Sequence, residues 1–357
     1  MNSALPKPLH HVGGRPMLAW AIDAAKASGV DRIVTVLSRD SASTQDWLGQ
    51  QEFVIQHPPL GTGHAVLAAR EALADFDGVS LVMFADTPLV TSHTLAMLSA
   101  EIVDGQDISI LGFETSQPTG YGRIIRDADG EVQKVVEERD TTGEEASVTL
   151  VNGGIMAART PLLFDLLDSV DASNAQNEIY LTDIVSVGRS RGCSIACEIT
   201  DMDELMGVNS RADLARAEDL LQAQLREAAM ASGVTLQAPH TVFLSANSVI
   251  ERDVIIEPHV VIGTGCHIGE GSVIKAFSHI EGARLGACCV IGPYARLRPG
   301  TNAADGVKIG NFVETKNVSL GDSAKASHLT YLGDAEIGAA ANIGAGTITC
   351  NYDGFNK

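Results

Sequence analysis

Asp86 lies two residues after the end of residues 79–84, a short apolar run that predicts a buried strand. Ligands of open α/β sheets bind beyond the carboxyl ends of the strands, and carboxylate oxygens suit divalent cations. Asp86 is therefore a candidate metal ligand. An aspartate that caps a helix beginning near Thr91 would give the same sequence pattern.

Two glycines flank a threonine in the loop Gly61-Thr62-Gly63, just before a predicted helix. Glycines let a ligand approach the backbone closely, so this loop suits contact with a nucleotide, and a plain helix cap is the alternative. Lys7 lies between two prolines. It is a candidate phosphate contact, or a lysine that is simply solvated.

Arg298 and Lys316 each directly follow an inward-facing position of a six-residue repeat, Leu297 and Thr315. Their spacing places the two cations on adjacent coils, about 4.8 Å apart. Two like charges held this close repel, which favours a shared anion such as a sugar phosphate. A solvated surface pair is the alternative.

His328 lies between the inward positions Ala326 and Leu332, so its side chain is expected outside the core. An exposed histidine is often incidental, but Tyr331 and the cations nearby favour a role in proton transfer.

Aliphatic residues recur at intervals of six through the last third of the chain, with a one-residue slip after Ile280 and two more after Ile309. The series is Ile250, Ile256, Ile262, Ile268, Ile274, Ile280, Leu285, Ile291, Leu297, Ile309, Leu320, Leu332, Ile337 and Ile343. A period of six is typical of a parallel β-helix, in which three short strands make one coil of about eighteen residues. A sandwich of ordinary strands needs turn signals at other intervals and would not keep this period.

Strand-like and helix-like segments alternate in the first part of the chain, which favours βαβ units and a mostly parallel sheet. The predicted helices are residues 16–29, 64–74, 94–103, 179–189 and 209–230, and the predicted strands are 32–37, 53–55, 79–84, 148–157 and 194–199. A hairpin is expected to join residues 123–126 and 131–136. The domain boundary is expected near residues 232–233.

Composition excludes several classes of protein. The 357 residues are 45% hydrophobic, enough for two domains, and the net charge of −20 argues against nucleic acid or an anionic membrane as partner. No apolar run approaches the length of a membrane span, and the start has no secretory leader pattern. The six cysteines lack zinc-site spacing, so we interpret them as reduced thiols of a cytoplasmic protein.

The sequence patterns at both ends predict that the chain is incomplete. A nucleotide-binding α/β domain normally opens with a strand and a Gly-rich phosphate loop, whereas this chain opens at Met1 beyond that point. Lys357 falls within the repeats, before any polar capping element.

Several longer motifs carry a family resemblance. In order they are Leu5-Pro6-Lys7, Gln56, Leu60-Gly61-Thr62-Gly63-His64-Ala65, Ala85-Asp86-Thr87-Pro88-Leu89, Pro118-Thr119-Gly120-Tyr121-Gly122-Arg123-Ile124, Val136-Glu137 and Gly207-Val208-Asn209. They resemble the uridylyltransferase half of the bacterial bifunctional N-acetylglucosamine-1-phosphate uridylyltransferase/glucosamine-1-phosphate N-acetyltransferase family. Residues 292–300 and 328–352 are similar to its acetyltransferase half.

The resemblance implies a fold and a division of the chain. It implies a Rossmann-like nucleotidyltransferase domain in residues 1–208, lacking its first strand and Gly-rich loop. A linker helix in residues 209–232 and a left-handed parallel β-helix of hexapeptide repeats in residues 233–357 would follow, incomplete at the C-terminus. It also implies a cytoplasmic homotrimer with active sites between neighbouring solenoids.

For uridylyl transfer from UTP to N-acetylglucosamine-1-phosphate, the resemblance implies a role for each matching residue. Uridine would contact Gln56, Gly61 and Thr62; the sugar would contact Gly122, Glu137 and Asn152; Mg²⁺ would bind Asp86 and Asn209; and phosphate would contact Lys7. One position departs from the family, since Ala85 stands where a glycine usually precedes the aspartate.

For acetyl transfer from acetyl-CoA to glucosamine-1-phosphate, the resemblance implies that His328 is the general base. Arg298, Lys316, Tyr331 and Asn342 would bind the sugar phosphate, and Ala345, Asn351 and Tyr352 would complete the sugar and acetyl-CoA site. Two alternatives stay open: a monofunctional sugar-phosphate nucleotidyltransferase with a regulatory β-helix, and an inactive scaffold.

Overall fold

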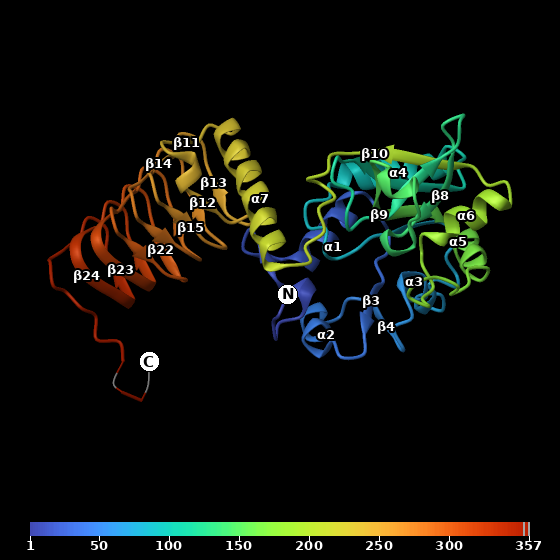
Figure 1. Cartoon of the computed structure of the whole chain (residues 1–357). Coiled ribbons are helices and arrows are strands. Elements are labelled where there is room, and N and C mark those ends of the chain that lie inside the picture. Colours follow the sequence, from blue (N-terminus) through green and yellow to red (C-terminus); the bar gives the residue numbers. More distant parts are fainter. Residues whose placement is uncertain (353, 356–357) are drawn as a thin grey trace. The chain divides into compact units, whose positions relative to one another are not determined.

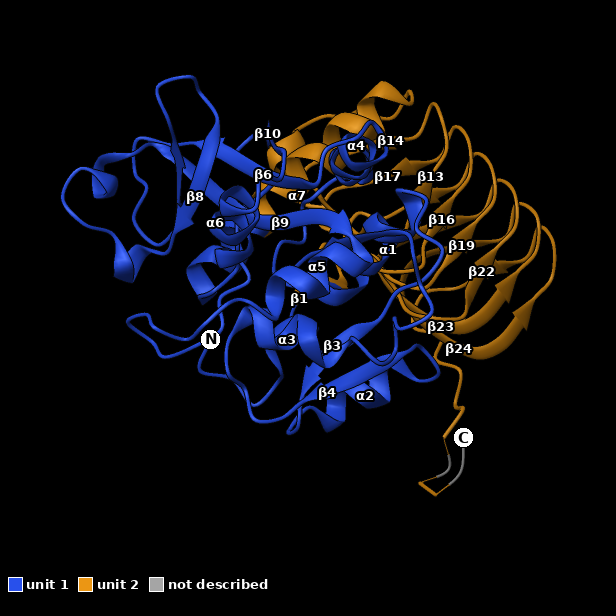
Figure 2. Cartoon of the chain, turned by 90° about the vertical axis from the view of Figure 1, so that its right-hand side faces the viewer, with its two compact units in different colours: residues 1–10, 16–217 blue, residues 11–15, 218–357 orange. Residues whose placement is uncertain are grey.

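The computed structural model describes residues 1–352 and 354–355, and the chain divides into two compact units (Figure 2). Unit 1 comprises residues 1–10 and 16–217, and unit 2 comprises residues 11–15 and 218–357. Helix α7 (Arg211–Ala231) crosses the boundary between the two units.

Unit 1 contains a central sheet with helices around it (Figure 1). Its helices are α1 (Met17–Ala27), α2 (Ala42–Leu48), α3 (Thr62–Ala68), α4 (Ser92–Val103), α5 (Thr160–Leu167) and α6 (Asp183–Ser190). Its strands are β3 (Thr35–Ser38), β4 (Phe53–Gln56), β5 (Val79–Val82), β6 (Ile108–Glu114), β7 (Arg123–Arg126), β8 (Val132–Val136), β9 (Leu150–Arg159) and β10 (Ile195–Ile199). The two-residue strands β1 (His11–Val12) and β2 (Arg15–Pro16) pair with each other, and all of their residues except Pro16 belong to unit 2.

The six-stranded sheet is mixed, so the expectation of a mostly parallel sheet is wrong. β10 and β6 pair in parallel, but β9 runs antiparallel to β5, β6 and β7. The predicted hairpin of β7 and β8 reverses the chain just before β9. An apolar run shows that a strand is buried, but its direction depends on the connection that precedes it.

Alternating side chains of β6 enter two separate cores. Ile108 and Ile110 pack in the cluster that also contains residues of α5 and α6, whereas Leu111 and Phe113 pack with residues of α4. The sheet is therefore covered on both faces, which leaves the carboxyl ends of its strands available to shape a site.

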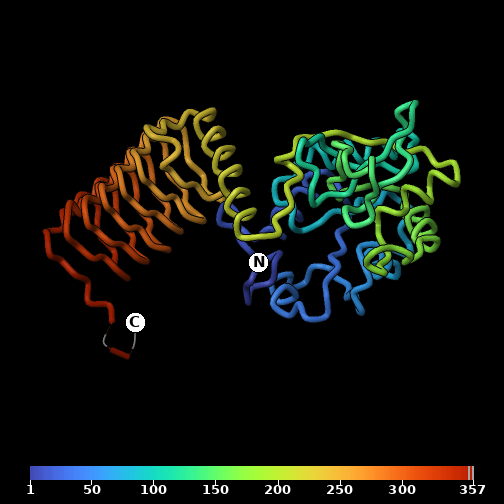
Figure 3. The backbone as a smooth tube through the Cα atoms, viewed as in Figure 1, coloured from blue at the N-terminus to red at the C-terminus, as the bar shows by residue number. Residues whose placement is uncertain are grey.

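Unit 2 is a three-sided parallel β-helix whose coils follow one another evenly in the backbone trace (Figure 3). Its strands are β11 (Thr235–Leu236), β12 (Phe243–Leu244), β13 (Val249–Ile250), β14 (Ile255–Ile256), β15 (Val261–Ile262), β16 (His267–Ile268), β17 (Val273–Ile274), β18 (His279–Ile280), β19 (Arg284–Leu285), β20 (Val290–Ile291), β21 (Arg296–Leu297), β22 (Thr301–Ala303), β23 (Lys308–Leu320), β24 (Lys325–Ile337) and β25 (Asn342–Ile343).

The strands of unit 2 pair in three ladders, one for each side of the coil. The first runs from β11 through β14, β17 and β20 to the beginnings of β23 and β24 and then to β25. The second runs from β12 through β15, β18 and β21 to the middle of β23 and β24, and the third from β13 through β16, β19 and β22 to their ends. The aliphatic residues of the six-residue period stack in register, for example Ile256 on Ile274 and Ile262 on Ile280, which confirms the predicted solenoid.

A column of rings lies along one corner of these coils, between the first and second ladders. His259, Phe277, Tyr294 and Phe312 stack on successive coils with ring centroids 4.9 to 5.3 Å apart, and Leu329 follows on β24. All five residues have positive φ, from 52° to 61°. Residues other than glycine rarely adopt a positive φ, and the stacking of the rings offsets part of the free-energy cost of this backbone conformation.

Among the described residues, no helix is both long and apolar enough to cross a membrane.

Candidate active sites

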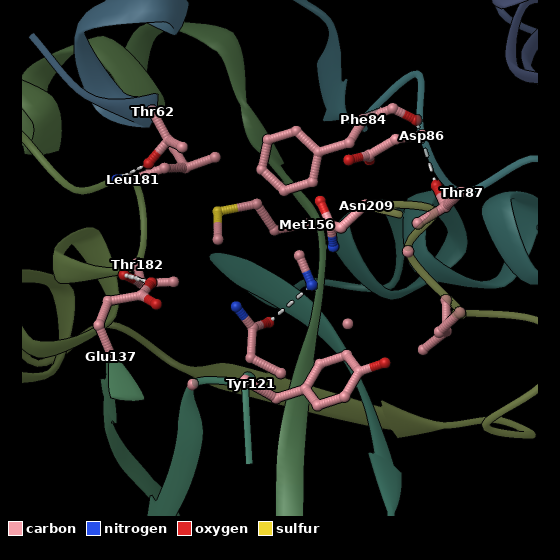
Figure 4. Close-up of a pocket in the computed structure, with 17 residues that line it drawn as sticks. Thr62, Phe84, Asp86, Thr87, Tyr121, Glu137, Met156, Leu181, Thr182 and Asn209 are labelled. Carbon is pink, nitrogen blue, oxygen red and sulfur yellow. Dashed lines mark hydrogen bonds between the residues drawn. The ribbon is translucent and has the colours of Figure 1, made fainter. Parts of the chain in front are cut away.

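A cavity of about 230 Å³ opens in unit 1 beyond the end of β5, before the start of β7 and along β9 (Figure 4). Its lining comprises Thr62, Phe84, Asp86, Thr87, Gly120, Tyr121, Gly122, Glu137, Asn152, Gly153, Gly154, Met156, Leu181, Thr182, Leu205, Gly207 and Asn209. Six predicted site residues are in this set: Thr62, Asp86, Gly122, Glu137, Asn152 and Asn209.

The structure excludes one of the two interpretations of Asp86, the helix cap. Thr91 caps helix α4, because its side chain accepts a hydrogen bond of 3.2 Å from the Thr94 N–H. Asp86 is free of that role and lines the cavity, and its carbonyl accepts a 2.8 Å hydrogen bond from the Val208 N–H. This bond places Asn209 beside Asp86. Ala85, the departure from the family pattern, packs against the apolar cluster of α1 and β3.

Lys7 is not simply solvated. Its ammonium donates to the Asp86 carboxylate and to Asn209 Oδ1, the latter at 2.6 Å. Two side-chain oxygens therefore converge on the Lys7 ammonium. Oxygen atoms are the ligands that Mg²⁺ prefers. Within residues 1–352 and 354–355, no group of three His, Cys, Asp or Glu side chains could hold a metal. A divalent ion here would need further oxygens, such as those of substrate phosphates.

The loop Gly61-Thr62-Gly63 lies at the start of α3, and Gly61 is the residue before the helix. Gln56 orders this loop by donating to the Gly61 carbonyl at 2.9 Å. Thr62 accepts a 2.9 Å hydrogen bond at Oγ1 from the Leu181 N–H. Gln56 and Gly61 do not belong to the cavity lining, but Gly61 directly precedes Thr62, which does, and Gln56 bonds to Gly61.

The residues predicted to contact the sugar come from three segments that meet near β7. The Asn152 N–H of β9 donates to the Gly122 carbonyl at 2.8 Å, and Asn152 Oδ1 accepts from the Gly154 N–H at 3.1 Å. A side chain at Gly122 would lie 3.5 Å from Glu137 Oε2, so the glycine leaves that carboxylate open to the cavity. Burial raises the pKa of Glu137, the Thr182 hydroxyl opposes this by hydrogen bonding, and Asp140 adds to it.

Sequence reasoning did not select three side chains that shape this cavity: Phe84, Tyr121 and Thr182. The Phe84 ring fills the space beside Gly154: a Cβ atom at position 154 would lie only 2.5 Å from it. Tyr121 packs edge-on against Phe113 with ring centroids 4.9 Å apart. Phe84 directly precedes a quoted motif and Tyr121 lies within one, but Thr182 falls inside the predicted helix of residues 179–189 and gave no signal for a site, whereas the structure places it just before α6.

On unit 2, the register places Leu297 opposite Thr315, so Arg298 and Lys316 follow each other on adjacent coils of the second ladder. Glu314 lies on the same ladder and pairs with Arg298 at 2.9 Å. This carboxylate, which sequence reasoning did not include, neutralises part of the positive charge. Lys316 lies opposite Gly333 on the next coil.

His328 is exposed, as expected for a residue outside the core, and lies opposite Asn311 on β23. It directly precedes Leu329 at the corner between the first and second ladders. Asn342 is exposed on β25, in the first ladder. Arg298, Lys316 and Tyr331 belong to the second ladder. The predicted acetyl-transfer residues thus lie on two sides of one corner of the coil.

The last three predicted residues lie on the coil after β24. Ala345 and Tyr352 are exposed, and Asn351 is half-buried. Asn351 donates to the Tyr331 hydroxyl at 3.4 Å and also to the Asp334 carboxylate. Asn351 therefore joins this coil to Tyr331, whereas Ala345 and Tyr352 have no such link among the hydrogen bonds described.

Comparison with known proteins matches both units to transferase families. Residues 1–147 match the MobA-like NTP transferase domain, and residues 247–282 match the bacterial transferase hexapeptide repeat. These matches and the strand pairing confirm the predicted fold class, a Rossmann-like nucleotidyltransferase domain followed by a left-handed parallel β-helix of hexapeptide repeats.

Curated relatives match the chain from end to end. Proteins named "Bifunctional protein GlmU" are 47% identical in Azorhizobium caulinodans, 48% in Sphingopyxis alaskensis and 49% in Xanthobacter autotrophicus. Each match covers 100% of this chain and 80% of the relative. With this identity over its whole length, the chain belongs to the bifunctional GlmU family.

Proposed function

We propose that the protein catalyses two steps in the formation of UDP-N-acetylglucosamine, acetyl transfer on unit 2 and uridylyl transfer in the cavity of unit 1. The observation that carries this proposal is the gathering of the predicted uridylyl-transfer residues. Six of them line one cavity: Thr62, Asp86, Gly122, Glu137, Asn152 and Asn209. Lys7 bonds to Asp86 and Asn209, Gly61 directly precedes Thr62, and Gln56 bonds to Gly61.

In uridylyl transfer, a phosphate oxygen of N-acetylglucosamine-1-phosphate attacks the α-phosphorus of UTP, and pyrophosphate leaves. Gln56, Gly61 and Thr62 would hold the uridine, and Gly122, Glu137 and Asn152 the sugar. Asp86 and Asn209 would ligate Mg²⁺, which neutralises phosphate charge when bound. Lys7 would place a further positive charge near the phosphates, which matters in a protein of net charge −20.

In acetyl transfer, the amine of glucosamine-1-phosphate forms a bond to the acetyl carbon of acetyl-CoA, and the thiolate of coenzyme A leaves. His328 would take the proton that the amine loses. Lys316, Arg298, Tyr331 and Asn342 would bind the sugar phosphate. Ala345, Asn351 and Tyr352 would continue the site toward acetyl-CoA.

The division of these residues between two sides of a corner fits a site that a neighbouring copy completes. We therefore also propose a homotrimer with active sites between adjacent solenoids, located in the cytoplasm. The proposed functional limits are residues 1–208 for uridylyl transfer, 209–232 for a linker and 233–357 for acetyl transfer.

Two assays on the purified full-length protein test the proposal. One measures pyrophosphate release from UTP and N-acetylglucosamine-1-phosphate, and the other measures free thiol from acetyl-CoA and glucosamine-1-phosphate. Activity in both supports the bifunctional enzyme. Activity in the first alone would favour a nucleotidyltransferase with a regulatory β-helix, and activity in neither would favour a scaffold.

Lys7 and a divalent cation compete for the same two oxygens, so Lys7→Met should strengthen metal binding to the nucleotide-free protein. We expect Mn²⁺ to bind about tenfold more tightly, because one nearby positive charge is removed. Electron paramagnetic resonance of free Mn²⁺ measures this directly. Lys134→Met is the matched control, since Lys134 pairs with Glu145 at 2.6 Å outside the cavity lining. Unchanged or weaker binding to Lys7→Met would contradict the competition.

Lys316→Ala should weaken binding of glucosamine-1-phosphate rather than slow the chemical step. An ion pair with a phosphate is made in the ground and transition states alike, so KM should rise about tenfold with kcat nearly unchanged. Lys308→Ala, on the same strand but in the first ladder, is the control and should keep the wild-type KM. A fall in kcat at constant KM would assign Lys316 to the chemical step instead.

A further inference from the structure

One segment of unit 1 connects the nucleotide side of the cavity with the sugar side. We call residues 178–182, just before helix α6, the strap. Ile179 donates its N–H to the Leu60 carbonyl at 2.8 Å, and its own carbonyl accepts from the Gly63 N–H at 2.8 Å. The Leu181 N–H donates to Thr62 Oγ1 at 2.9 Å. The strap is therefore bonded through Ile179 and Leu181 to Leu60 and to the first two residues of α3.

The two glycines of the loop Gly61-Thr62-Gly63 are required by the strap. A side chain at Gly61 would lie 2.5 Å from the Ile179 carbonyl oxygen, and one at Gly63 would lie 2.8 Å from Ile179 Cγ2. Neither gap would hold a Cβ atom without movement of the strap. The glycines that suggested nucleotide contact in the sequence thus also serve to seat the strap on the loop.

The C-terminal end of the strap, Thr182, contacts the part of the cavity proposed to bind the sugar. Thr182 donates from Oγ1 to Glu137 Oε1 at 2.8 Å, and both residues line the cavity (Figure 4). Thr182 is 5% exposed, so its hydroxyl has little access to bulk water. A buried hydroxyl that donates to a carboxylate holds that carboxylate in one orientation.

The surroundings of Glu137 are acidic. Asp140 and Asp183 place negative charge close to Glu137. Burial, followed by smaller effects that include the charge of Glu137, raises the pKa of the Tyr180 phenol. Burial, followed by the charges of Glu137, Asp140 and Asp171, raises the pKa of Asp183 to about 6. The Thr182 hydroxyl acts in the opposite direction on Glu137, because a donated hydrogen bond favours the ionised carboxylate.

We propose that Thr182, held in place by the strap, is a positioning residue that orients the Glu137 carboxylate and keeps it ionised for contact with the sugar. This rests on the proposed uridylyl transfer and on the assignment of Glu137 to sugar binding. An ionised carboxylate offers acceptors on both oxygens, and Thr182 occupies one site on Oε1. Oε2, which lies toward Gly122, remains for a sugar hydroxyl.

Thr182→Val removes the hydroxyl but keeps the shape of the side chain. We expect KM for N-acetylglucosamine-1-phosphate to rise about tenfold or more, the effect of losing a hydrogen bond to a charged group. KM for UTP should stay within about twofold, since the strap's backbone bonds to the loop are retained. Thr182→Ser keeps a hydroxyl and should restore most of the sugar-phosphate affinity.

The pH profile distinguishes positioning from general damage to the fold. Without the hydroxyl the pKa of Glu137 rises further, so the acidic limb of kcat/KM should move to higher pH in Thr182→Val and return in Thr182→Ser. Thr160→Val is the matched control: Thr160 is 1% exposed and donates to the Gly78 carbonyl at 3.0 Å outside the cavity lining. It should lower the melting temperature and leave KM and the acidic limb unchanged.

If the wild-type enzyme is active, and Thr182→Val has the same KM for N-acetylglucosamine-1-phosphate and the same acidic limb of kcat/KM, the proposed role of Thr182 is overturned. Failure of Thr182→Ser to restore either quantity, or the same shifts in Thr160→Val, would also overturn it. A wild-type protein without uridylyl transfer would instead refute the proposed function, so the two failures are distinguishable.

Discussion

Asp86→Ala in the purified full-length protein should lower uridylyl transfer by about 10³-fold or more and leave acetyl transfer at the wild-type rate. The reaction brings two phosphate-bearing substrates together, and a metal that neutralises their charge contributes several kcal/mol to the transition state. Of the two groups that accept a hydrogen bond from the Lys7 ammonium, the Asp86 carboxylate and Asn209 Oδ1, only Asp86 carries a negative charge. The pyrophosphate and thiol assays on the same preparation measure both effects.

Removal of this carboxylate also leaves the Lys7 ammonium with Asn209 as its remaining described partner, so stability must be controlled. Asp104→Ala removes an exposed carboxylate at the end of α4 and should change neither activity. Asn209→Ala should reproduce the selective loss, since Asn209 Oδ1 shares the same cation. Equal loss of both activities in Asp86→Ala would point to a folding defect rather than a metal site.

Periodicity in the sequence was sufficient to predict unit 2. Each inward aliphatic residue must stack on its counterpart one coil away, so the fold repeats in the sequence itself. The pairing of Ile262 with Ile280 and of Leu297 with Thr315 follows directly from that spacing. The ring column was not predicted, because the corner residues repeat in position but not in residue type.

The sheet of unit 1 was predicted less well, for two physical reasons. Strand β6, whose residues Ile108 to Phe113 are all buried, went unpredicted, as did α5 and α2. A short apolar run buried on both faces shows no alternation to distinguish strand from helix. The direction of β9 depends on long-range pairing, which no local pattern encodes.

The candidate cavity shows the same limit at the level of single residues. Asp86 and Gly122 lie in motifs that predict a site, whereas Thr182 acts through a contact with Glu137 that spans 45 positions of the chain. A threonine within a predicted helix is an ordinary feature of sequences, and the contact of its hydroxyl with Glu137 appears only in the folded chain, where the strap packs on Gly61 and Gly63. Contacts of this kind depend on tertiary structure, so one sequence does not reveal them.

His328→Ala should lower kcat for acetyl transfer by about 10²–10⁴-fold, the usual contribution of a positioned general base. The substrate ammonium must lose a proton before its nitrogen attacks the thioester, and His328 is an exposed imidazole beside the corner that separates the two groups of predicted sugar-phosphate residues. Without it, only the amine already deprotonated in solution would react. The deficit should therefore narrow as the pH rises toward the pKa of that ammonium.

Uridylyl transfer gives the internal control and should keep its wild-type rate, because the residues described as lining the cavity all belong to unit 1. His279→Ala is the matched variant: His279 is also exposed on the solenoid, but it lies opposite Val261 and Arg296 on earlier and later coils. Thiol release at several pH values measures all three proteins. A His328→Ala enzyme with wild-type turnover at neutral pH would remove His328 from the mechanism, whereas a deficit that is constant with pH would show that it binds substrate without taking the proton.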